Sequence, residues 1–307
     1  MTRKVIVLGG SGMLGSMVVD DLSRDPEIKL AATVRTAALK AKCARKIPNV
    51  SWLIFDANAP DAEKALKVID GYDWVINTIG ITKPLVHDDN AFEVEMAIKI
   101  NSLLPHQLAR QAEPSGARVI QIATDCVYSG KKGEYVESDE FDALDVYGKT
   151  KSLGEVPSPG VYHLRCSIIG PEPKEHKFLL DWFLGQPKNA RVNGFVNHRW
   201  NGVATLHFSR LCHGIITRDL KLTHVQHIVP TGEVTKCELL EQFARYFHRE
   251  DITVTPVKAP VVVDRTLKTT DEALNLAIWS AAGYRRPPSV PEMVTELASF
   301  DYRLNGL

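Results

Sequence analysis

The sequence has little of what marks secreted or metal-binding proteins. It holds only five cysteines among 307 residues, and their odd number cannot form a complete set of pairs. They are Cys43, Cys126, Cys166, Cys212 and Cys237. Cysteines scattered in this way argue against a disulfide framework and against a zinc cluster. We therefore expect a reducing setting, and the expected location is the cytoplasm.

Long hydrophobic runs are missing as well. No apolar stretch approaches the ~18 residues that a membrane-spanning helix needs. The chain begins with a strand-like segment, Lys4 to Leu8, in place of the charged and apolar leader of a secreted protein. We therefore expect neither secretion nor a membrane partner.

The sequence also lacks an excess of charge of either sign. Lysine and arginine together number 37, and so do aspartate and glutamate. This balance, without a basic stripe, argues against nucleic acid as a partner. The ten histidines include no pair four residues apart, and no group of cysteines and histidines has zinc-like spacing. No metal ligand set is predicted.

What the sequence does contain is a regular alternation of short apolar runs and helical segments. The apolar runs cover residues 5–8, 30–34, 52–55, 74–77, 119–123 and 161–165. Such alternation predicts a doubly wound parallel sheet with helices on both faces, which is an α/β fold.

A glycine-rich turn follows the first apolar run. It satisfies both Gly-x-x-Gly-x-x-Gly, from Gly9, and Gly-x-Gly-x-x-Gly, from Gly10. Between a strand and a helix, such glycines allow a tight turn and let backbone N–H groups approach a pyrophosphate. The expected sheet is therefore of the Rossmann type, with a smaller C-terminal substrate-binding region. The residues expected to bind a dinucleotide here are Gly9, Ser11, Gly12, Met13, Leu14 and Gly15.

The second apolar run ends at Arg35, where proteins that bind NAD carry an acidic residue. An arginine can pair with the 2′-phosphate of NADP in bidentate fashion, whereas a carboxylate would repel it. NADPH is therefore the expected cofactor, and NAD is disfavoured; a solvated loop cation is the other interpretation of Arg35. Asp56, after the third run, is expected either to contact the adenine or to cap its strand.

The alternation ends near residue 165. Residues 170–173 (Gly-Pro-Glu-Pro) break the pattern, and irregular sequence with aromatic residues follows through residue 205. Residues 224–229 are typical of a returning strand, and residues 235–247 of an amphipathic helix opened by a threonine cap. The prolines beyond residue 255 predict a loop-rich remainder. We expect an NADP-binding domain at 1–165, with a returning segment near 204–230, and a substrate-binding region at 166–203 and 231–307.

Three polar side chains form a candidate catalytic set. Thr124 follows the fifth apolar run, and Tyr147 and Lys151 lie four residues apart, on one face of an expected helix. A cation beside a phenol lowers the tyrosine pKa from its ordinary value near ~10, which makes proton transfer feasible. The threonine hydroxyl can hydrogen-bond the same substrate oxygen.

Together these motifs resemble the extended short-chain dehydrogenases/reductases. The resemblance rests on the glycine turn, on Asn101, on Thr124, and on Tyr147 with Lys151. Three segments are most similar to the dTDP-4-dehydrorhamnose reductase branch: Ala-Thr-Asp-Cys-Val-Tyr-Ser-Gly, Tyr-Gly-Lys-Thr-Lys-Ser-Leu-Gly-Glu and His-Leu-Arg-Cys-Ser-Ile-Ile-Gly. The match is dense up to Gly170 and thin afterwards.

The resemblance implies an NADPH-dependent reduction of the 4-keto group of a nucleotide-linked 4-keto-6-deoxy sugar. By this analogy Tyr147 protonates the forming alkoxide, Thr124 orients the ketone, and Lys151 depresses the tyrosine pKa and contacts the nicotinamide ribose. Asn101 matches a residue that supports a water-mediated proton path; a buried asparagine bonded to nearby backbone is its other interpretation. A nucleotide sugar is the expected partner, and a homodimer is a further possibility that the superfamily suggests.

Cys126 separates the reactions known in this superfamily. Nucleotide-sugar 4,6-dehydratases typically carry glutamate at this position, so dehydration is disfavoured. GDP-fucose synthase carries a cysteine there and a histidine shortly after the next strand, which Cys126 and His176 resemble. A bifunctional 3,5-epimerase and 4-reductase is therefore an alternative, with the thiol and imidazole exchanging protons beside the ketone. A packing role for Cys126 and a surface position for His176 are the other interpretation.

In the second region, the segment at 193–205 contains groups suited to a nucleotide diphosphate. Arg199 can pair with phosphate and Trp200 can stack on a base or sugar. Asp125 and Arg265 complete the substrate-binding candidates. The alternative for Trp200 is a packing anchor, and the alternative for Arg199 is a surface ion pair.

A function of another class is a non-catalytic sensor or scaffold that binds NADP. Proteins of that kind tend to lose the tyrosine or the lysine. Because Thr124, Tyr147 and Lys151 are all present, the sequence favours an enzyme.

Overall fold

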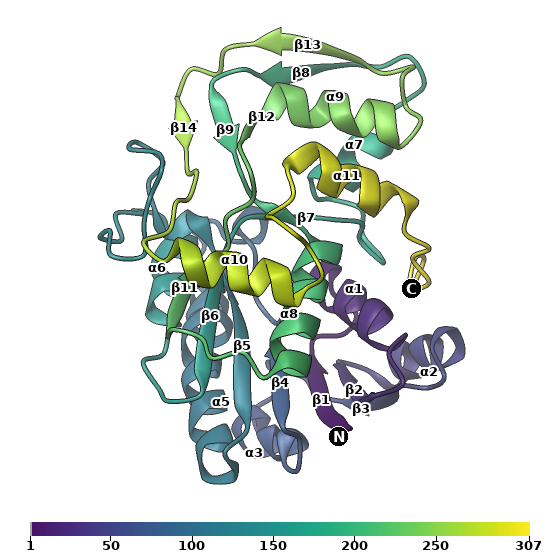
Figure 1. Ribbon diagram of the computed structural model, residues 1–307, viewed down its shortest axis with the longest axis vertical. Helices are drawn as coiled ribbons and strands as arrows, with labels where there is room; N and C mark the ends of the chain where they lie inside the picture. The colour runs from purple at the N-terminus through teal and green to yellow at the C-terminus, as the bar shows by residue number, and fades with distance from the viewer. Residues whose placement is uncertain (1) are drawn as a thin grey trace.

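Apolar runs bounded by turn residues form a central sheet of seven parallel strands (Figure 1). The computed structural model describes residues 2–307. The strands are β1 (Arg3–Leu8), β2 (Ile28–Val34), β3 (Ser51–Ile54), β4 (Trp74–Asn77), β5 (Arg118–Ala123), β6 (Val161–Arg165) and β11 (Val225–His227). Their order is β11-β6-β5-β4-β1-β2-β3. The predicted parallel sheet and its returning strand are thus confirmed.

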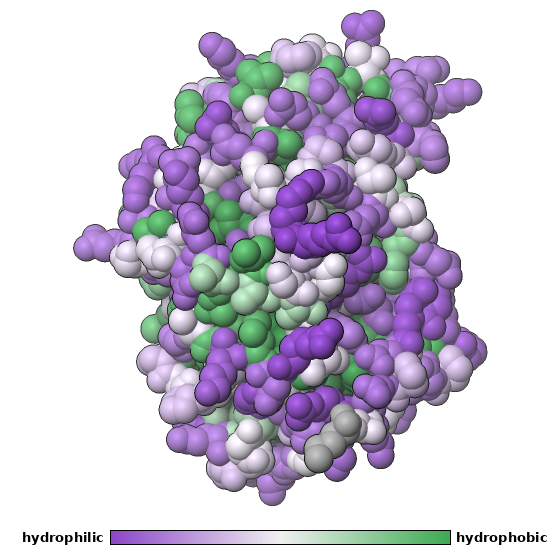
Figure 2. Space-filling view, viewed as in Figure 1, coloured by the Kyte–Doolittle hydropathy of each residue, from purple (hydrophilic) through white to green (hydrophobic). Residues whose placement is uncertain are grey.

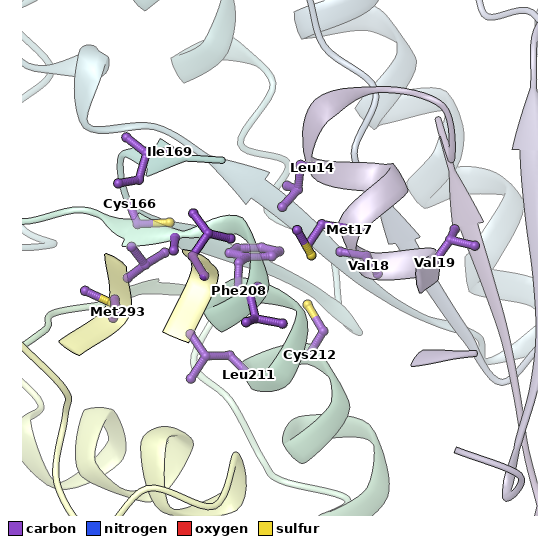
Figure 3. Close-up of a cluster of buried hydrophobic side chains, with 14 of the residues drawn as sticks. Leu14, Met17, Val18, Val19, Cys166, Ile169, Phe208, Leu211, Cys212 and Met293 are labelled. Atoms are coloured by element: carbon purple, nitrogen blue, oxygen red, sulfur yellow. The ribbon is translucent and has the colours of Figure 1, made fainter. Parts of the chain in front are cut away.

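Helices cover both faces of this sheet, which is consistent with the runs of consecutive apolar residues in β1 and β4. They are α1 (Met13–Leu22), α2 (Ala37–Lys46), α3 (Ala62–Ala65), α4 (Ala91–Ala97), α5 (Leu104–Ala112), α6 (Val146–Leu153) and α8 (Thr205–Arg218). On one face α1 packs against α8, with Met17, Phe208 and Cys212 fully buried (Figure 3). On the other, Leu104 and Leu108 of α5 lie in a second buried cluster with Val75 of β4.

The C-terminal region contains more regular structure than its composition suggests. Three small sheets pair β7 (Ile168–Ile169) with β10 (Val203–Ala204), β8 (Arg191–Phe195) with β13 (Thr253–Val257), and β9 (His198–Trp200) with β12 (Val234–Thr235) and β14 (Val263–Asp264). The helices here are α7 (Leu179–Leu184), α9 (Lys236–Tyr246), α10 (Glu272–Ala281) and α11 (Val290–Ser299).

The expectations of an irregular segment through residue 205 and of a loop-rich remainder are therefore wrong. Pro291 lies in the first turn of α11, where a missing N–H costs nothing, and Ser289 with Glu292 forms a capping box there. Pro256 lies within the strand β13. The helix expected at 235–247 is confirmed as α9, and Thr235 caps it with Glu238.

The end of the chain returns to the first helix (Figure 1). The Tyr302 hydroxyl donates to Ser16 Oγ at 2.6 Å, and Arg303 Nε donates to Asp20 Oδ1 at 2.8 Å. Residues more than 280 positions apart are thereby joined, so the substrate-binding region and the NADP-binding domain expected from the sequence share contacts. Their exact boundaries stay a prediction.

The face of the molecule drawn in Figure 2 is largely hydrophilic, with smaller hydrophobic areas between the polar side chains. Within residues 2–307, no helix has both the length and the hydropathy to span a bilayer. The same residues form no cluster of three or more His, Cys, Asp or Glu side chains placed to hold a metal ion.

Candidate active site

The glycine turn between β1 and α1 brings the strand and the helix unusually close together. Gly9 has a φ of +86°, a conformation that favours glycine, and its carbonyl accepts a hydrogen bond from Gly12 N at 3.0 Å. A Cβ on Gly15 would lie 2.2 Å from Gly9 O, so only glycine allows this approach. A Cβ on Gly12 would meet only that same oxygen, at 3.5 Å, which leaves the start of α1 accessible.

A cleft of about 520 Å³ opens in front of this turn. Four of the predicted cofactor residues line it, namely Gly9, Ser11, Gly12 and Met13, together with Arg35 and Asp56. The chemistry fits a dinucleotide, because backbone N–H groups at the start of α1 and the guanidinium of Arg35 suit phosphate groups. Asp56 Oδ1 also accepts from Asn58 N at 3.0 Å, so it shapes the turn after β3 as well.

Among the residues predicted to bind the cofactor, Leu14 and Gly15 of the turn do not line the cleft, and neither do Tyr147 and Lys151. The Leu14 side chain is buried in the hydrophobic core (Figure 3), and Gly15 lies beneath the turn against Gly9. Their side-chain positions therefore serve packing, and binding of the cofactor through their backbone N–H groups stays a prediction.

The candidate catalytic loop begins where β5 ends. Thr124 follows Ala123 directly and caps the short helical turn Asp125–Val127, with its Oγ1 accepting from Cys126 N at 3.1 Å. Its hydroxyl also donates to Asp125 Oδ1 at 3.3 Å. Burial raises the pKa of the Asp125 carboxyl, and the charges of Arg265 and Lys236 oppose that shift.

Helix α6 carries Tyr147 and Lys151 to this loop. Asp145 caps the helix by accepting from Gly148 N at 2.8 Å. A Cβ on Gly148 would lie 2.5 Å from Cys126 O, so the helix can dock on the loop only because this position is glycine. The docking places the half-buried Tyr147 within hydrogen-bonding reach of Thr124.

The pKa of Tyr147 is shifted in the direction opposite to the one expected from its spacing to Lys151. Burial is the largest cause that raises the pKa of the Tyr147 phenol well above its ordinary value. Lys151 Nζ donates to the Ile122 carbonyl at 3.0 Å, and burial lowers the lysine pKa to about 8. The expected net decrease of the Tyr147 pKa is absent, because desolvation dominates, and an influence of Lys151 on that pKa stays a prediction. The phenol stays protonated at neutral pH.

Asn101 lies in a π-helical turn, Ile98–Leu103, between α4 and α5. Its Oδ1 accepts from Ile81 N at 2.9 Å, and its Nδ2 donates to Ile81 O at 3.0 Å. The same Nδ2 donates to Thr150 Oγ1 of α6 at 3.4 Å. The side chain thus joins the Ile81 loop to the catalytic helix, which matches the interpretation of a buried asparagine bonded to backbone. A part in a proton path stays a prediction.

Cys126 and His176 have different surroundings. Burial and the charge of Asp125 raise the pKa of the Cys126 thiol to about 12. His176 Nδ1 bonds Asp181 Oδ2 at 2.6 Å, in a loop beside the glycine-turn cleft. These contacts give His176 a local structural partner in place of the cysteine.

The substrate candidates from the second region separate in the structure. Trp200 is 4% exposed and its indole donates to Ser167 Oγ at 2.8 Å, so its predicted stacking on a ligand is wrong and it is a packing anchor. The Arg199 guanidinium pairs with Glu233 at 2.6 Å on the surface. Arg265 is brought near Asp125 and Cys126, and its Nε donates to the Tyr128 carbonyl at 2.7 Å.

Lys236 is a site residue that the sequence did not reveal. Its ammonium lies 5.3 Å from the centre of the Trp200 ring, and the charges of Asp125 and Cys126 act on it. Burial lowers its pKa to about 8. Within residues 2–307 it has no ion pair or direct hydrogen bond through this ammonium. The only sequence signal is its place as the first residue of the predicted helix, which says nothing of its distant neighbours.

The chain matches the model of a family described as the RmlD substrate binding domain, over residues 3–300. It is 25% identical to a dTDP-4-dehydrorhamnose reductase of Mycolicibacterium smegmatis over 175 residues, 55% of this chain and 46% of that protein. It is 23% identical to methionine adenosyltransferase 2 subunit beta of Danio rerio over 268 residues, 83% of this chain and 77% of that protein. With most of the first curated relatives, the matched part spans only about half of their length.

Solved structures share the fold at low identity. The dTDP-4-dehydrorhamnose reductase of Bacillus anthracis, determined in complex with NADP, superimposes with a TM-score of 0.72 and 17% identity, covering 97% of this chain and 99% of that one. The family match extends over nearly the whole chain, and the glycine turn, the Thr124 loop and helix α6 lie within it. This chain belongs to the RmlD substrate binding domain family.

Proposed function

We propose that this protein is an NADPH-dependent oxidoreductase of the short-chain dehydrogenase/reductase type. Its reaction would be reduction of the 4-keto group of a nucleotide-linked 4-keto-6-deoxy sugar. The observation that carries this proposal is the position of Tyr147, on a helix that packs against the Thr124 loop at the carboxyl end of β5. In open parallel sheets, ligands bind at this end of the strands.

The proton chemistry follows from the environment of Tyr147. NADPH, when bound, supplies the hydride that the carbonyl carbon receives. Tyr147 donates its proton to the carbonyl oxygen as that oxygen gains negative charge, and solvent restores the proton afterwards. With its raised pKa the phenol carries at neutral pH the proton that it would donate, although a general acid works best with a pKa near the operating pH. To fix the same oxygen, the Thr124 hydroxyl would turn from Asp125 Oδ1, to which it now donates, and donate to the substrate.

Lys151, which lies on helix α6 with Tyr147, would contribute a positive charge to the site. With a pKa of about 8 it is mostly charged at neutral pH, and Glu155 supports the charge. By analogy with the family, it contacts the ribose next to the nicotinamide. Its bond to the Ile122 carbonyl fixes the direction from which it would do so.

The substrate side of the site would be formed by residues from both regions of the chain. Arg265 and Lys236 place two cations close to Asp125 and Cys126. Cations of this kind suit the oxygens of a sugar and the diphosphate of a nucleotide sugar. Relatives named dTDP-4-dehydrorhamnose reductase support the choice of a nucleotide-linked keto sugar as substrate.

The test is oxidation of NADPH, followed by absorbance, with dTDP-4-dehydrorhamnose and related 4-keto nucleotide sugars. Tyr147→Phe is expected to bind NADPH like the wild type and to lose turnover by roughly 10²- to 10⁴-fold, as expected for loss of a general acid. Tyr162→Phe, which removes a phenol hydroxyl from β6, is the matched control and should turn over normally. Full activity of Tyr147→Phe would refute the proposed acid.

A non-catalytic role is the second candidate, and one comparison favours it. The relatives with the longest aligned segment include a protein named as a subunit of a methionine adenosyltransferase. In this second candidate the present chain would bind NADPH as a sensor or scaffold, without reducing a sugar. Tight binding of NADPH, together with no turnover on any 4-keto nucleotide sugar, would select this candidate over the reductase.

The bifunctional epimerase is not proposed. At a pKa of about 12 the Cys126 thiol is a poor base at neutral pH, and His176 is already bonded to Asp181. Reduction in D₂O should therefore leave C3 and C5 of the product free of deuterium. Incorporation at either carbon, lost in Cys126→Ser, would restore the epimerase.

A further inference from the structure

The loop between β7 and α7 forms one wall of the glycine-turn cleft. It comes from the C-terminal part of the chain, whereas the opposite wall comes from β1, β2 and β3. The loop residues that line the cleft are Glu172, Pro173, Lys174, Glu175, Lys177 and Phe178. A segment far away in sequence thus covers the place where the sequence pattern expects a dinucleotide.

This loop is held in place by buried acids. Asp181 Oδ2 accepts from Glu172 N at 3.0 Å and bonds His176 Nδ1 at 2.6 Å, and Glu172 Oε2 accepts from Phe178 N at 2.6 Å. Glu175 and His176 have φ values of 72° and 51°, a left-handed conformation that residues other than glycine rarely adopt. These hydrogen bonds support the conformation in which the loop lines the cleft.

Two cations on the cleft walls, Arg35 and Lys174, have no counter-charge in contact with them. A third cation of the cleft, Lys177, does have one, because its Nζ lies 3.6 Å from Glu175 Oε2. Neither Arg35 nor Lys174 makes an ion pair or side-chain hydrogen bond within the part of the chain that the structure describes, although both line the cleft. Burial, and next the charge of Arg35, lower the pKa of Lys174, and the charge of Glu175 opposes this shift without contacting the ammonium. Like charges that face one cavity disfavour each other, and an anion between them relieves this cost.

The position of this pair relative to the glycine turn indicates which anion it suits. In a Rossmann-type fold the turn meets the pyrophosphate, and the residue that follows β2 meets the 2′ position of the adenosine ribose. Arg35 is that residue. Lys174 faces the same cleft from the other wall, and Asp56 lies farther along, after β3.

We propose that Lys174 and Arg35 together clamp the 2′-phosphate of NADPH, and that Lys174 is a determinant of the preference for NADPH over NADH. This inference rests on the cofactor of the proposed function, not on its sugar substrate. NADH carries a neutral hydroxyl at the same place and gains nothing from the second cation. Discrimination between the cofactors would thereby depend on a loop from the C-terminal region.

The test measures cofactor binding alone, without any sugar, by isothermal titration calorimetry of the full chain. Lys174→Gln should weaken NADPH binding by roughly tenfold or more, as for loss of a hydrogen bond between charged groups, and leave NADH binding unchanged. Adenosine 2′,5′-bisphosphate should lose affinity in parallel, whereas 5′-AMP should not. Thermal unfolding of each variant shows whether the fold is retained.

Lys177→Gln is the matched control, because it removes the same charge from the same loop at a residue with an acidic neighbour. It should change NADPH affinity much less than Lys174→Gln. His176→Ala tests the support of the loop: it should lower NADPH affinity with Lys174 present and have little further effect in Lys174→Gln.

Equal losses in the two lysine variants would overturn the clamp in favour of a general charge effect. Equal affinity of the wild type for NADPH and NADH would also overturn it. Neither result bears on whether the protein reduces a sugar ketone with Tyr147 as the acid, which is decided by turnover with either cofactor. Absence of turnover, with the NADPH preference intact, would reject the reductase and leave the clamp standing.

Discussion

Gly148 of helix α6 lies directly against the carbonyl oxygen of Cys126, so closely that a Cβ would come within 2.5 Å of it. The contact joins the helix that carries Tyr147 to the loop that carries Thr124. Gly154, at the other end of α6, packs even more closely against Asn101, since a Cβ on Gly154 would be 2.0 Å from Asn101 O. These two glycines thus allow helix α6 to pack closely against the Thr124 loop and against Asn101.

We expect Gly148→Ala to damage the site more than the fold. The new methyl group must push α6 away from the loop, at a cost of about 1–3 kcal/mol, as for other overpacked positions. A shift of about 1 Å between Tyr147 and the ketone would reduce turnover by roughly 100-fold. The measurements are thermal unfolding and kcat.

Ser152→Ala is the control for the glycine prediction. The Ser152 hydroxyl donates only to Lys149 O within the same helix, at 2.9 Å, so its loss should affect neither measurement. Wild-type turnover in Gly148→Ala would show that the close docking of α6 does not position Tyr147.

A buried ion pair lies just beyond the C-terminal end of α6. Arg165 of β6 pairs with Glu155, and their side chains are 1% and 6% exposed. Arg165 Nη1 also donates to the Tyr128 hydroxyl at 2.8 Å and to His227 Nε2 at 2.7 Å. Arg165→Met should lower the free energy of unfolding by about 3–5 kcal/mol, because it leaves Glu155 buried and unpaired. Chemical denaturation measures this loss.

The double variant Arg165→Met with Glu155→Gln should be less destabilised than the single arginine variant, since the uncompensated charge is gone. Arg110→Met breaks an exposed pair with Glu63 and should cost no more than about 1 kcal/mol. If the buried and exposed variants cost the same, the buried pair does not carry the stability assigned to it.

Turnover should decline as the pH rises through about 8. Burial lowers the pKa of Lys151 from its ordinary 10.5 to about 8. Because a lysine is charged below its pKa and neutral above it, a role for the Lys151 charge predicts activity that is present below about pH 8 and lost above it. An exposed lysine would retain its charge to a higher pH. The pH dependence of kcat/KM for the reduction measures this limb.

Three variants identify the group that titrates. Lys151→Arg should abolish the alkaline limb, since arginine stays charged, and Glu155→Gln should move it to lower pH by removing the charge that supports Lys151. Lys236 also has a pKa of about 8, so Lys236→Gln is the necessary comparison. If the alkaline decline of kcat/KM persists in Lys151→Arg and disappears in Lys236→Gln, the group that titrates is Lys236, on the substrate side of the site.

The local features of the site were predictable from the sequence, because they depend on residues close together in the chain. A strand, a glycine turn and a helix in succession predicted the cleft, and helical spacing predicted that Tyr147 and Lys151 share α6. The environment of these groups was not predictable. Lys151 bonds to the Ile122 carbonyl, and burial raises the pKa of Tyr147 in place of the decrease that spacing alone suggested.

The same division holds for the C-terminal region. The threonine cap of α9 was predicted from the sequence, and the structure adds Glu238, which completes a capping box with Thr235. The paired short strands were not, since each has five residues or fewer and is stabilised by a partner far away in the chain. Trp200 could have been a stacking surface or an anchor, and only its burial beside Ser167 decides for the anchor.

By itself, then, the sequence determined the alternating strands and helices, the glycine turn and the identity of the polar groups in the catalytic set. These features follow from hydrogen bonding and side-chain periodicity over a few residues. Tertiary structure alone decided that Lys236 lies near Asp125 and that Lys174 shares a cleft with Arg35. The physical reason is that contacts over more than a hundred residues depend on how the elements pack, which no local pattern encodes.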